Sequence, residues 1–396
     1  GLLFMGGMAV IRGCAVEELR PGMRLVEPVT DGCGRMIVKP GTELNRRVIE
    51  ILGRLHIGPV DVVEWREEGM APPRRAVVSE IVERESSWHP GPFCSIVDPL
   101  WDLFREHYEG WMVRLKRQFA NLQAESNEAK EEVLWNEFEA VVSEIADLSL
   151  LGVQVLPCIH FMSRQEEYLV HHSLNVSLLA AMMARLLDWN EQEVNEVALS
   201  ALLHDVGKLQ VPEEILHKTE SLTPMEMRTV QGHAVLGFRL LQEAGVFPLP
   251  VLAGVLQHHE RLDGSGYPIS VGQAKMHAYS RVLAIADMYD AMTSKKMYGK
   301  QHNPFTAARE LRRDMSRDRL DVPATRALLT QIHQFLVGQK VRLDNGSEGW
   351  LTQWDESCGE NAVVMDKRGR TYLLNDRCGM AIQTIVQPRR KEMLGD

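Results

Sequence analysis

The sequence has no closely spaced cysteine pair, no long apolar run and no excess of basic charge. No uncharged apolar run approaches the roughly 18 residues of a membrane span. The formal net charge of −10 argues against a nucleic-acid polymer as partner, although bound metal ions could still attract a small anionic ligand. The cysteines form no CxxC motif, which excludes a zinc ribbon or a disulfide framework and predicts free thiols in a cytoplasmic protein: Cys14, Cys33, Cys94, Cys158, Cys358 and Cys378.

The length of 396 residues predicts two to four domains, which we expect to be mainly α overall. Residues 1–7 lack the basic region and apolar core of a signal peptide, and we interpret them as an expression remnant ahead of Met8. Residues 8–66 are predicted to form a small α+β regulatory domain. Its expected elements are the strands Leu25–Val29, Arg35–Val38 and Val60–Val63, a turn at Asp31–Gly34, and a helix with apolar residues at Leu44, Val48, Ile51, Leu52 and Leu55.

Residues 67–95 contain four prolines among charged residues, which indicates a linker. Residues 96–157 have a helical pattern and are predicted to be a connector with a polar middle at Gln123–Glu132. That polar stretch is interpreted either as a solvated face, which we prefer, or as part of a helical pair that transmits signals or forms a homodimer.

Residues 158–337 are predicted to be an all-α domain. An amphipathic helix begins at Tyr168 and carries His172 on its apolar stripe, and a second helix leads into His204–Asp205, where Gly207 signals its end. Thr223–Glu226 has the form of a capping box for a helix that carries His233, and Arg281–Ser294 is expected to be a helix with Asp287 and Asp290. In residues 338–390, short β-prone runs and the turn Asp344–Gly346 predict a small five-stranded barrel or sheet.

Histidine and aspartate gather in this helical part of the chain. His258-His259-Glu260 continues through Gly266-Tyr267 to Pro268, and His204-Asp205-Val206-Gly207-Lys208 lies about fifty residues upstream, with His233 between them. Nine of the 14 histidines fall between residues 158 and 290. Neutral imidazoles bind transition metals and an aspartate can bridge two ions, so the pattern indicates a site for more than one metal ion. A lone His172 would more often be a core histidine, but the clusters downstream favour a ligand.

This ordered set resembles the HD-GYP subgroup of HD-domain phosphodiesterases, bacterial enzymes that hydrolyse the second messenger cyclic di-GMP. The resemblance covers about 170 residues, from Tyr168 to near Phe335. It implies an all-α HD-type catalytic domain, flanked here by the α+β N-terminal domain and the β-rich C-terminal domain. Glu18–Met23 also looks like part of a unit often found ahead of such domains.

The resemblance implies two divalent metal ions, with iron or manganese as the expected metals. One would be held by His172, His204, Asp205 and Asp287, and the other by His233, His258 and His259, with Asp205 bridging both. A hydroxide shared by the metals would attack the phosphodiester and yield linear pGpG, GMP or both. Asp205 and Lys208 would be the catalytic residues, since the Lys208 ammonium can stabilise charge on a phosphate oxygen.

The sequence departs from the family pattern at two places. Some members hold a third metal through a carboxylate four residues before the first ligand histidine, but that position here is Tyr168, and Glu167 lies about 140° round the helix from His172. We therefore expect two metals. Lys296-Met297-Tyr298-Gly299 replaces a pattern like Arg-Pro-Tyr-Arg, and Lys300 is expected to compensate.

The predicted substrate contacts are Lys208, Gly266, Tyr267, Lys296 and Lys300. Gly264–Pro268 is interpreted either as a tight turn or as a loop that lines the substrate entrance or contacts a signalling protein. Three functions follow from these residues: a cyclic di-GMP phosphodiesterase, a cyclic-dinucleotide-responsive module with little turnover, and an HD-type hydrolase of another nucleotide. The complete His258–Pro268 motif favours the first over the third.

Overall fold

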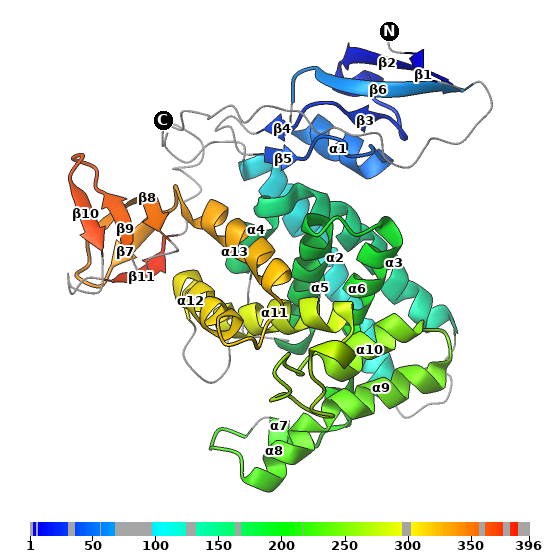
Figure 1. Cartoon of the computed structure of the whole chain (residues 1–396), viewed down its shortest axis with the longest axis vertical. Coiled ribbons are helices and arrows are strands. Elements are labelled where there is room, and N and C mark those ends of the chain that lie inside the picture. The colour runs from blue at the N-terminus through cyan, green and yellow to red at the C-terminus, as the bar shows by residue number, and fades with distance from the viewer. Residues whose placement is uncertain are drawn as a thin grey trace. The chain divides into compact units, whose positions relative to one another are not determined.

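A computed structural model describes residues 3–4, 7–30, 36–55, 57–67, 97–123, 132–162, 168–216, 218–294, 302–355, 361–374 and 381–386. The chain divides into two compact units, one formed by residues 1–102 and 389–396 and the other by residues 103–388. Helices dominate the second unit, which confirms the mainly α fold (Figure 1). No helix within the described ranges is long and apolar enough to cross a membrane.

The first unit is an α+β structure. Its four-stranded sheet has the order β1-β2-β6-β3, and β2 pairs antiparallel with β6 along its whole length. The side chain of Asn45 caps α1, and this helix buries Val48, Ile51 and Leu52. The elements are β1 (Leu3–Phe4), β2 (Gly7–Cys14), η1 (Val16–Glu18), β3 (Arg24–Leu25), β4 (Val29–Thr30), β5 (Met36–Val38), α1 (Arg46–Arg54) and β6 (Val60–Glu67).

The predicted helix and the strand at residues 60–63 are confirmed in this unit, but the strand predicted at Leu25–Val29 is wrong. Leu25 ends β3 and Val29 begins β4, because the chain bends between them, where the Val26 amide donates to the carbonyl of Asp61. The strand β2 was not predicted. The turn expected at residues 31–34 and nearly all of the proline-rich segment 67–95 lie outside the described residues.

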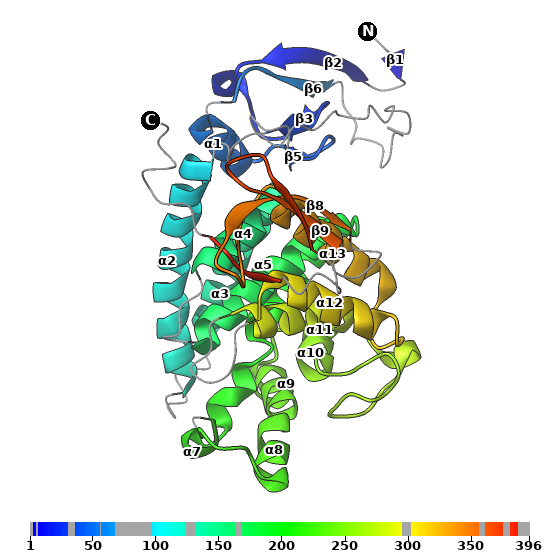
Figure 2. The same cartoon turned by 90° about the vertical axis from the view of Figure 1, so that its left-hand side faces the viewer.

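Two long helices, α2 (Val97–Gln123) and α3 (Glu132–Leu148), occupy the predicted connector (Figure 2). All of α3, and α2 from Leu103 onward, belong to the second unit. Side-chain hydrogen bonds join the two helices. The Trp111 indole donates to Glu144 at 2.8 Å, and the Arg114 guanidinium donates to the same carboxylate at 2.9 Å. The connector is therefore packed into the helical unit, while residues 124–131 of its polar middle lie outside the described residues.

The helical domain is built around α5, and all fifteen of its residues from Val170 to Ala184 are buried. The predicted helix is confirmed, but it is not amphipathic, because polar side chains such as Ser177, which donates to the carbonyl of Ala198, are satisfied inside the core. The elements are η3 (Ser149–Gln154), α4 (Val155–Met162), α5 (Tyr168–Leu186), α6 (Glu191–Leu203), η4 (Val206–Gln210), α7 (Glu213–Leu216), α8 (Pro224–Gln231), α9 (His233–Ala244), α10 (Leu249–Gln257), η5 (Gln273–Lys275), α11 (Ala278–Thr293), α12 (Pro304–Met315) and α13 (Val322–Leu336).

The C-terminal part of the second unit is an antiparallel five-stranded sheet with the order β10-β9-β8-β7-β11, as predicted. Gly346 adopts a φ of 82° in the turn after β7, a conformation that favours glycine. Trp354 of the sheet meets Phe305 edge-on and stacks on His333 of the helical domain, with ring centroids 5.2 and 5.7 Å apart. The strands are β7 (Lys340–Leu343), β8 (Glu348–Asp355), β9 (Asn361–Met365), β10 (Thr371–Leu374) and β11 (Ile382–Ile385).

Candidate metal centre

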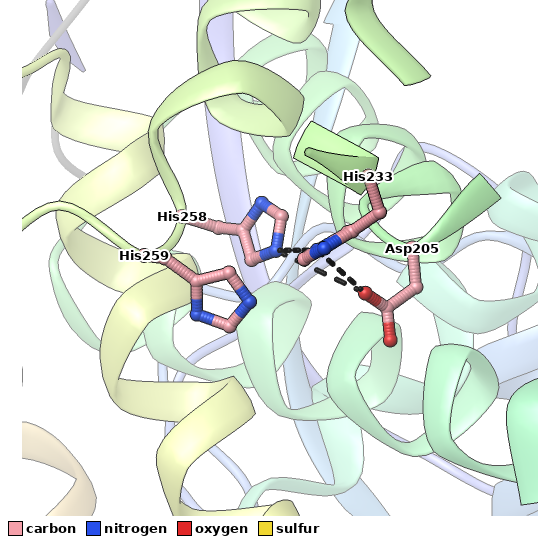
Figure 3. A group of neighbouring side chains, drawn as sticks. All are labelled: Asp205, His233, His258 and His259. Atoms are coloured by element: carbon pink, nitrogen blue, oxygen red, sulfur yellow. Dashed lines mark hydrogen bonds and ion pairs between the residues drawn. The ribbon is translucent and has the colours of Figure 1, made fainter. Parts of the chain in front are cut away.

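The seven predicted metal ligands come together in the helical domain as two adjacent groups. Within each group, one side-chain nitrogen or oxygen from every member lies within 4.8 Å of the others. Most of these side chains are buried, and His259 is about 19% exposed. The larger group is Asp205, His233, His258 and His259 (Figure 3), and the smaller one is His172, His204 and Asp287.

Helix ends position three of the histidines. His204 caps the C-terminus of α6, His258 caps that of α10, and His233 follows α8 after the single residue Gly232. Each Nδ1 lies 2.6 or 2.7 Å from the carbonyl three residues earlier, namely Ala201, Val255 or Val230. Carbonyls in the last turn of a helix lack a backbone donor within that helix. The histidine rings donate to them through Nδ1, and this orients Nε2 into the site.

This hydrogen-bonding pattern decides which ring nitrogens carry protons. A carbonyl only accepts, so Nδ1 carries a proton in His204, His233 and His258, and the neutral form of each ring has its lone pair on Nε2. The Nε2 atoms of His233 and His258 nevertheless face each other at 3.2 Å (Figure 3). Two lone pairs cannot form a hydrogen bond, so a cation between them is the arrangement that suits both nitrogens.

Two further atoms support the same conclusion. Among the described side chains, the buried His204 Nε2 and Asp205 Oδ1 have no hydrogen-bond partner. Leaving such atoms without a partner in a dry interior is costly, and a metal ion would satisfy both. The donor set present therefore fits a metal.

Asp205 lies between the two groups. Its Oδ1 is 3.2 Å from Nε2 of His233, and its Oδ2 is 3.4 Å from Nε2 of His204 and 3.6 Å from Nε2 of His172. The predicted helix was expected to run through His204 and Asp205, but α6 ends at Leu203 and Asp205 lies in the turn before η4. The turn, rather than helical rotation, presents each carboxylate oxygen to a different group.

Asp287 also contacts both groups. Its Oδ1 lies 3.1 Å from Nε2 of His172 and 4.0 Å from Nε2 of His204. Its Oδ2 lies 3.6 Å from Nδ1 of His259 in the other group. The prediction assigned Asp287 to one metal alone, whereas its position places a second oxygen beside the other group.

Asp290 is a site residue to which the sequence assigned no role. Its fully buried carboxylate accepts from Nδ1 of His172 at 2.7 Å, while Nε2 of the same ring faces Oδ1 of Asp287 at 3.1 Å. Asn175 and Ser294 donate to its other oxygen at 2.9 and 2.8 Å. A carboxylate behind a ligand histidine fixes the tautomer and orientation of the ring. Asp290 lies one helical turn after the predicted ligand Asp287 on α11, and this spacing could have suggested that Asp290 supports the site.

The electrostatic environment shifts the pKa values of the histidines in different directions. Burial, together with the neighbouring histidines, holds the pKa of His258 well below its usual value. Burial also lowers the pKa of His259 to about 3, although Asp287 opposes the shift. Burial alone would lower the pKa of His172 too, but its hydrogen bonds with Asp287 and Asp290 outweigh this and raise that pKa to about 10.

Both carboxylates are held in their ionised form. Burial by itself would raise the pKa of Asp205, but the charge of Lys208 is the largest opposing effect, and the pKa lies well below the usual value. Burial opposes the same shift in Asp287, whose pKa is lowered mainly by its hydrogen bond with His172. Ionised carboxylates are the form that coordinates a metal.

Gly207 allows η4 to touch α9. A Cβ at this position would lie 2.0 Å from the carbonyl oxygen of His233 and 2.5 Å from the amide nitrogen of Gly237. Since both are backbone atoms, only glycine permits this approach, which brings Asp205 beside His233. Gly207 was predicted to stop a helix, but α6 ends four residues earlier and the role of the glycine is close packing.

The predicted catalytic lysine also lies at the site. The Nζ of Lys208, whose side chain is 25% exposed, lies 2.5 Å from Oδ2 of Asp205.

Glu260 organises the loop that follows the two histidines. Its fully buried carboxylate accepts from the amides of Ile269, Ser270 and Val271 at 2.7 to 3.1 Å. A Cβ on Gly266 would come within 2.6 Å of backbone atoms of His259, Glu260 and Arg261. These contacts support the tight-turn interpretation of the loop.

Tyr267 extends from this loop over the site. Its ring centroid lies 4.6 Å from that of His259, and burial raises the pKa of its hydroxyl. The Tyr168 ring stacks on His172 with centroids 5.3 Å apart and planes tilted by 7°. An aromatic ring therefore occupies the position where a third-metal carboxylate was considered. Glu167, Lys296, Met297, Tyr298, Gly299 and Lys300 lie outside the described residues.

The fold is that of a helical domain of the HD type with two groups of candidate metal ligands, and comparison with known proteins agrees. Residues 157–323 match the family model described as HD domain. The chain is 33% identical over 234 residues to a cyclic di-GMP phosphodiesterase of Pseudomonas aeruginosa, covering 59% of this chain and 53% of that protein. It is 35% identical over 147 residues to a cyclic di-GMP phosphodiesterase of Thermotoga maritima, covering 37% and 40% of the two chains.

A third relative is named for a different substrate. A 3'3'-cGAMP-specific phosphodiesterase of Vibrio cholerae is 34% identical over 183 residues, covering 46% of this chain and 40% of that protein. The chain spans about half or less of the length of these relatives. The helical domain is thus similar to HD domains over residues 157–323, and the predicted resemblance to cyclic di-GMP phosphodiesterases is confirmed.

Proposed function

We propose that this chain is a metal-dependent phosphodiesterase that hydrolyses cyclic di-GMP to pGpG, GMP or both in bacterial second-messenger signalling. The observation that carries the proposal is the position of Asp205, whose two oxygens lie 3.2 Å from His233 and 3.4 Å from His204 in separate groups. An aspartate between two sets of imidazoles is the arrangement that a dinuclear phosphodiesterase needs. The similarity to relatives named for this activity supports the substrate class.

Two divalent ions, iron or manganese, are proposed for the two groups. Imidazole suits iron, and carboxylate oxygens suit manganese, so the mixed set accepts either. When bound, the ions would polarise the phosphodiester and lower the pKa of the attacking water. The proposed ligands are His172, His204, Asp205 and Asp287 for one ion, and His233, His258, His259 and Asp205 for the other.

The chain's own residues would bind and orient the phosphodiester. The Lys208 ammonium lies at the partly exposed edge of a site that is otherwise mostly buried. From there it can donate to a non-bridging phosphate oxygen as negative charge develops. Tyr267 covers His259 and offers an aromatic face to a base of the dinucleotide, since bases stack on such faces. Gly266 shapes the loop, while substrate contacts by Lys296 and Lys300 stay predictions.

Other parts of the prediction remain proposals. We propose a cytoplasmic location, which the free thiols of Cys14 and Cys158, the described cysteines, support. The domain boundaries at residues 66, 95, 157 and 337 stay predictions. So do a homodimer and contacts with signalling proteins through the loop 264–268 or the N-terminal domain.

The proposal is tested by adding cyclic di-GMP to chain loaded with Mn²⁺ or Fe²⁺ and separating the products by anion-exchange chromatography. We expect pGpG or GMP to accumulate, and we expect no product after chelation. A parallel reaction with 3'3'-cGAMP tests the substrate of the Vibrio cholerae relative. Faster hydrolysis of that substrate would change the substrate assignment, and a metal-loaded chain without turnover would contradict the proposed activity.

The shared aspartate provides the test of the dinuclear centre. Asp205→Ala removes the oxygens that face both groups, so both metals and the hydrolysis should be lost together. Metal analysis of the parent should approach two ions per chain, and that of the variant should approach none. A content of three ions in the parent, or full activity in the variant, would overturn the assignment.

A further inference from the structure

A chain of buried hydrogen bonds runs from α2 to the candidate metal centre. The Tyr108 hydroxyl on α2 donates to Oδ1 of Asn175 on α5 at 2.8 Å. The Asn175 amide donates to Oδ1 of Asp290 on α11 at 2.9 Å. The other oxygen of Asp290 accepts from Nδ1 of His172 at 2.7 Å. Three contacts thus connect a connector helix with a proposed metal ligand.

Each group in this series of hydrogen bonds has one orientation that satisfies both of its neighbours. An ionised carboxylate only accepts, so Asn175 must present its amide nitrogen to Asp290, which turns its carbonyl oxygen toward Tyr108. The Tyr108 hydroxyl meets that oxygen with its single proton. Its own oxygen can then accept from Nδ1 of His171 at 3.0 Å. A flipped Asn175 amide would set an oxygen against the Asp290 carboxylate, so the Tyr108 proton favours the working orientation.

Burial removes water as a substitute partner. Tyr108 is 1% exposed, and Asn175 and Asp290 are fully buried. Phenylalanine at position 108 would therefore leave Oδ1 of Asn175 without this donor in a dry interior, where a lost hydrogen bond is not replaced. The consequence would reach His172, because Asp290 sets the orientation of that ring.

We propose that Tyr108 is a positioning residue for the metal centre, acting through Asn175 and Asp290 on His172. This inference rests on the proposed function only in taking His172 as a metal ligand. It also assigns α2 a role beyond packing. From Leu103 onward this helix belongs to the second unit, and its packing on α5 is coupled to the geometry of the metal centre.

The test compares Tyr108→Phe with Tyr279→Phe in the full-length chain. Tyr279 is a matched control, because its 5% exposed ring also donates one hydrogen bond, at 2.8 Å, but to Glu196. Titration of the metal-free proteins with Mn²⁺, in the absence of any nucleotide, gives dissociation constants, and thermal unfolding gives stability. We expect Tyr108→Phe to weaken metal binding about fivefold to tenfold. Tyr279→Phe should change it less than about twofold, with a similar loss of melting temperature. Equal metal affinity in the two variants would overturn the proposal.

A double variant distinguishes action through Asp290 from a general packing effect. Asp290→Asn should weaken Mn²⁺ binding about tenfold or more, and adding Tyr108→Phe should then have little further effect, because both changes break one chain of contacts. Independent, additive losses would reject the link. If Tyr108→Phe does not fold, Asn175→Ser breaks the same chain from α5, and unchanged Mn²⁺ affinity in that variant would reject it equally. If the parent binds Mn²⁺ but does not hydrolyse cyclic di-GMP, the proposed function fails and this comparison still stands.

Discussion

At the scale of single residues, the centre shows how neighbours give one residue type different properties. His172 faces two carboxylates, which raise its pKa to about 10 despite its burial. His258 is just as buried but lies among other histidines, and its pKa is held well below the usual value. Since solvent is excluded from both, the difference comes from which charges stand within a few ångströms of each ring.

Lys208 is expected to serve the reaction rather than the fold. Lys208→Met keeps the length of the side chain but removes the ammonium, so kcat for cyclic di-GMP should fall about a hundredfold, as for other positioned electrostatic groups. In the metal-loaded protein the ions still neutralise Asp205, so metal content and melting temperature should change little.

The control for this experiment is Lys218→Met. Lys218 is also 25% exposed and pairs with a carboxylate, that of Glu226 at 2.7 Å, on a part of the chain without candidate ligands. The kcat of the Lys218→Met variant should equal that of the parent. Unchanged turnover in Lys208→Met would remove Lys208 from the mechanism, and an equal loss in both variants would indicate a nonspecific effect.

At the scale of elements, the centre is assembled from helix ends. The C-termini of α6, α8 and α10 supply the carbonyls that orient His204, His233 and His258. The turn after α6 adds Asp205, and α5 and α11 supply His172 and Asp287 from their interiors. The geometry of the site therefore depends on how closely these elements approach one another.

The contact between η4 and α9 is one of these close approaches. Gly207→Ala would place a Cβ 2.0 Å from the carbonyl oxygen of His233, so the two elements must separate and Asp205 must move from His233. We expect a loss of about 1 to 3 kcal/mol in stability and loss of metal from the group containing His233. Metal analysis and chemical denaturation measure both effects.

Gly110→Ala is the matched control for that substitution. Gly110 lies in α2, and no atom stands within 4 Å of the place that a Cβ would take, so alanine should keep the metals and raise helix stability by up to about 1 kcal/mol. Full metal content in Gly207→Ala would show that the close contact is not needed for the centre.

Glu260 should hold the loop after His259 in place. Glu260→Ala removes the acceptor of three backbone amides, those of residues 269–271, and should lower stability by about 2 to 3 kcal/mol. Hydrogen exchange across residues 263–272 should increase, whereas the exposed Glu220→Ala should leave it unchanged. Parent-like exchange in Glu260→Ala would show that other contacts hold the loop.

At the scale of the whole molecule, the two units contribute differently. All of the candidate ligands lie in the second unit, and its C-terminal sheet is tied to the helices by aromatic contacts and by the Asn303 amide, which donates to Ile382 at 2.9 Å. The first unit has its own sheet and its own buried residues around α1. The second unit should therefore form the metal centre without the first.

Two deletions test this division. Removing residues 1–96 should leave the metal content and the basal hydrolysis of cyclic di-GMP unchanged. Removing residues 339–396 should lower the melting temperature, because Trp354, which is 7% exposed, would no longer cover Phe305 and His333. Loss of metal after the first deletion would show that the first unit is needed for the centre.

Much of the fold and the candidate site follows from local sequence. The capping box at Thr223, the helix from Tyr168 to Leu186 and the five C-terminal strands all appear in the structure, because caps, apolar spacing and turns act between near neighbours. One helix boundary was missed nearby: α8 ends at Gln231 and α9 begins at His233, so the capping box does not open the helix that carries His233. All seven predicted ligand residues lie in the two groups.

The sequence by itself thus determined which residues could bind metal, but not which element carries each of them. Only the tertiary structure decided that Asp205 stands between the groups, that Asp290 supports His172 across 118 residues of sequence, and that Tyr108 connects to Asn175 across 67. The reason is physical: spacing along a helix reports which neighbours share a face, but a hydrogen bond between helices depends on how their backbones pack. Gly207 illustrates this, since its meaning lies in a contact with α9 that its own neighbours in the sequence do not reveal.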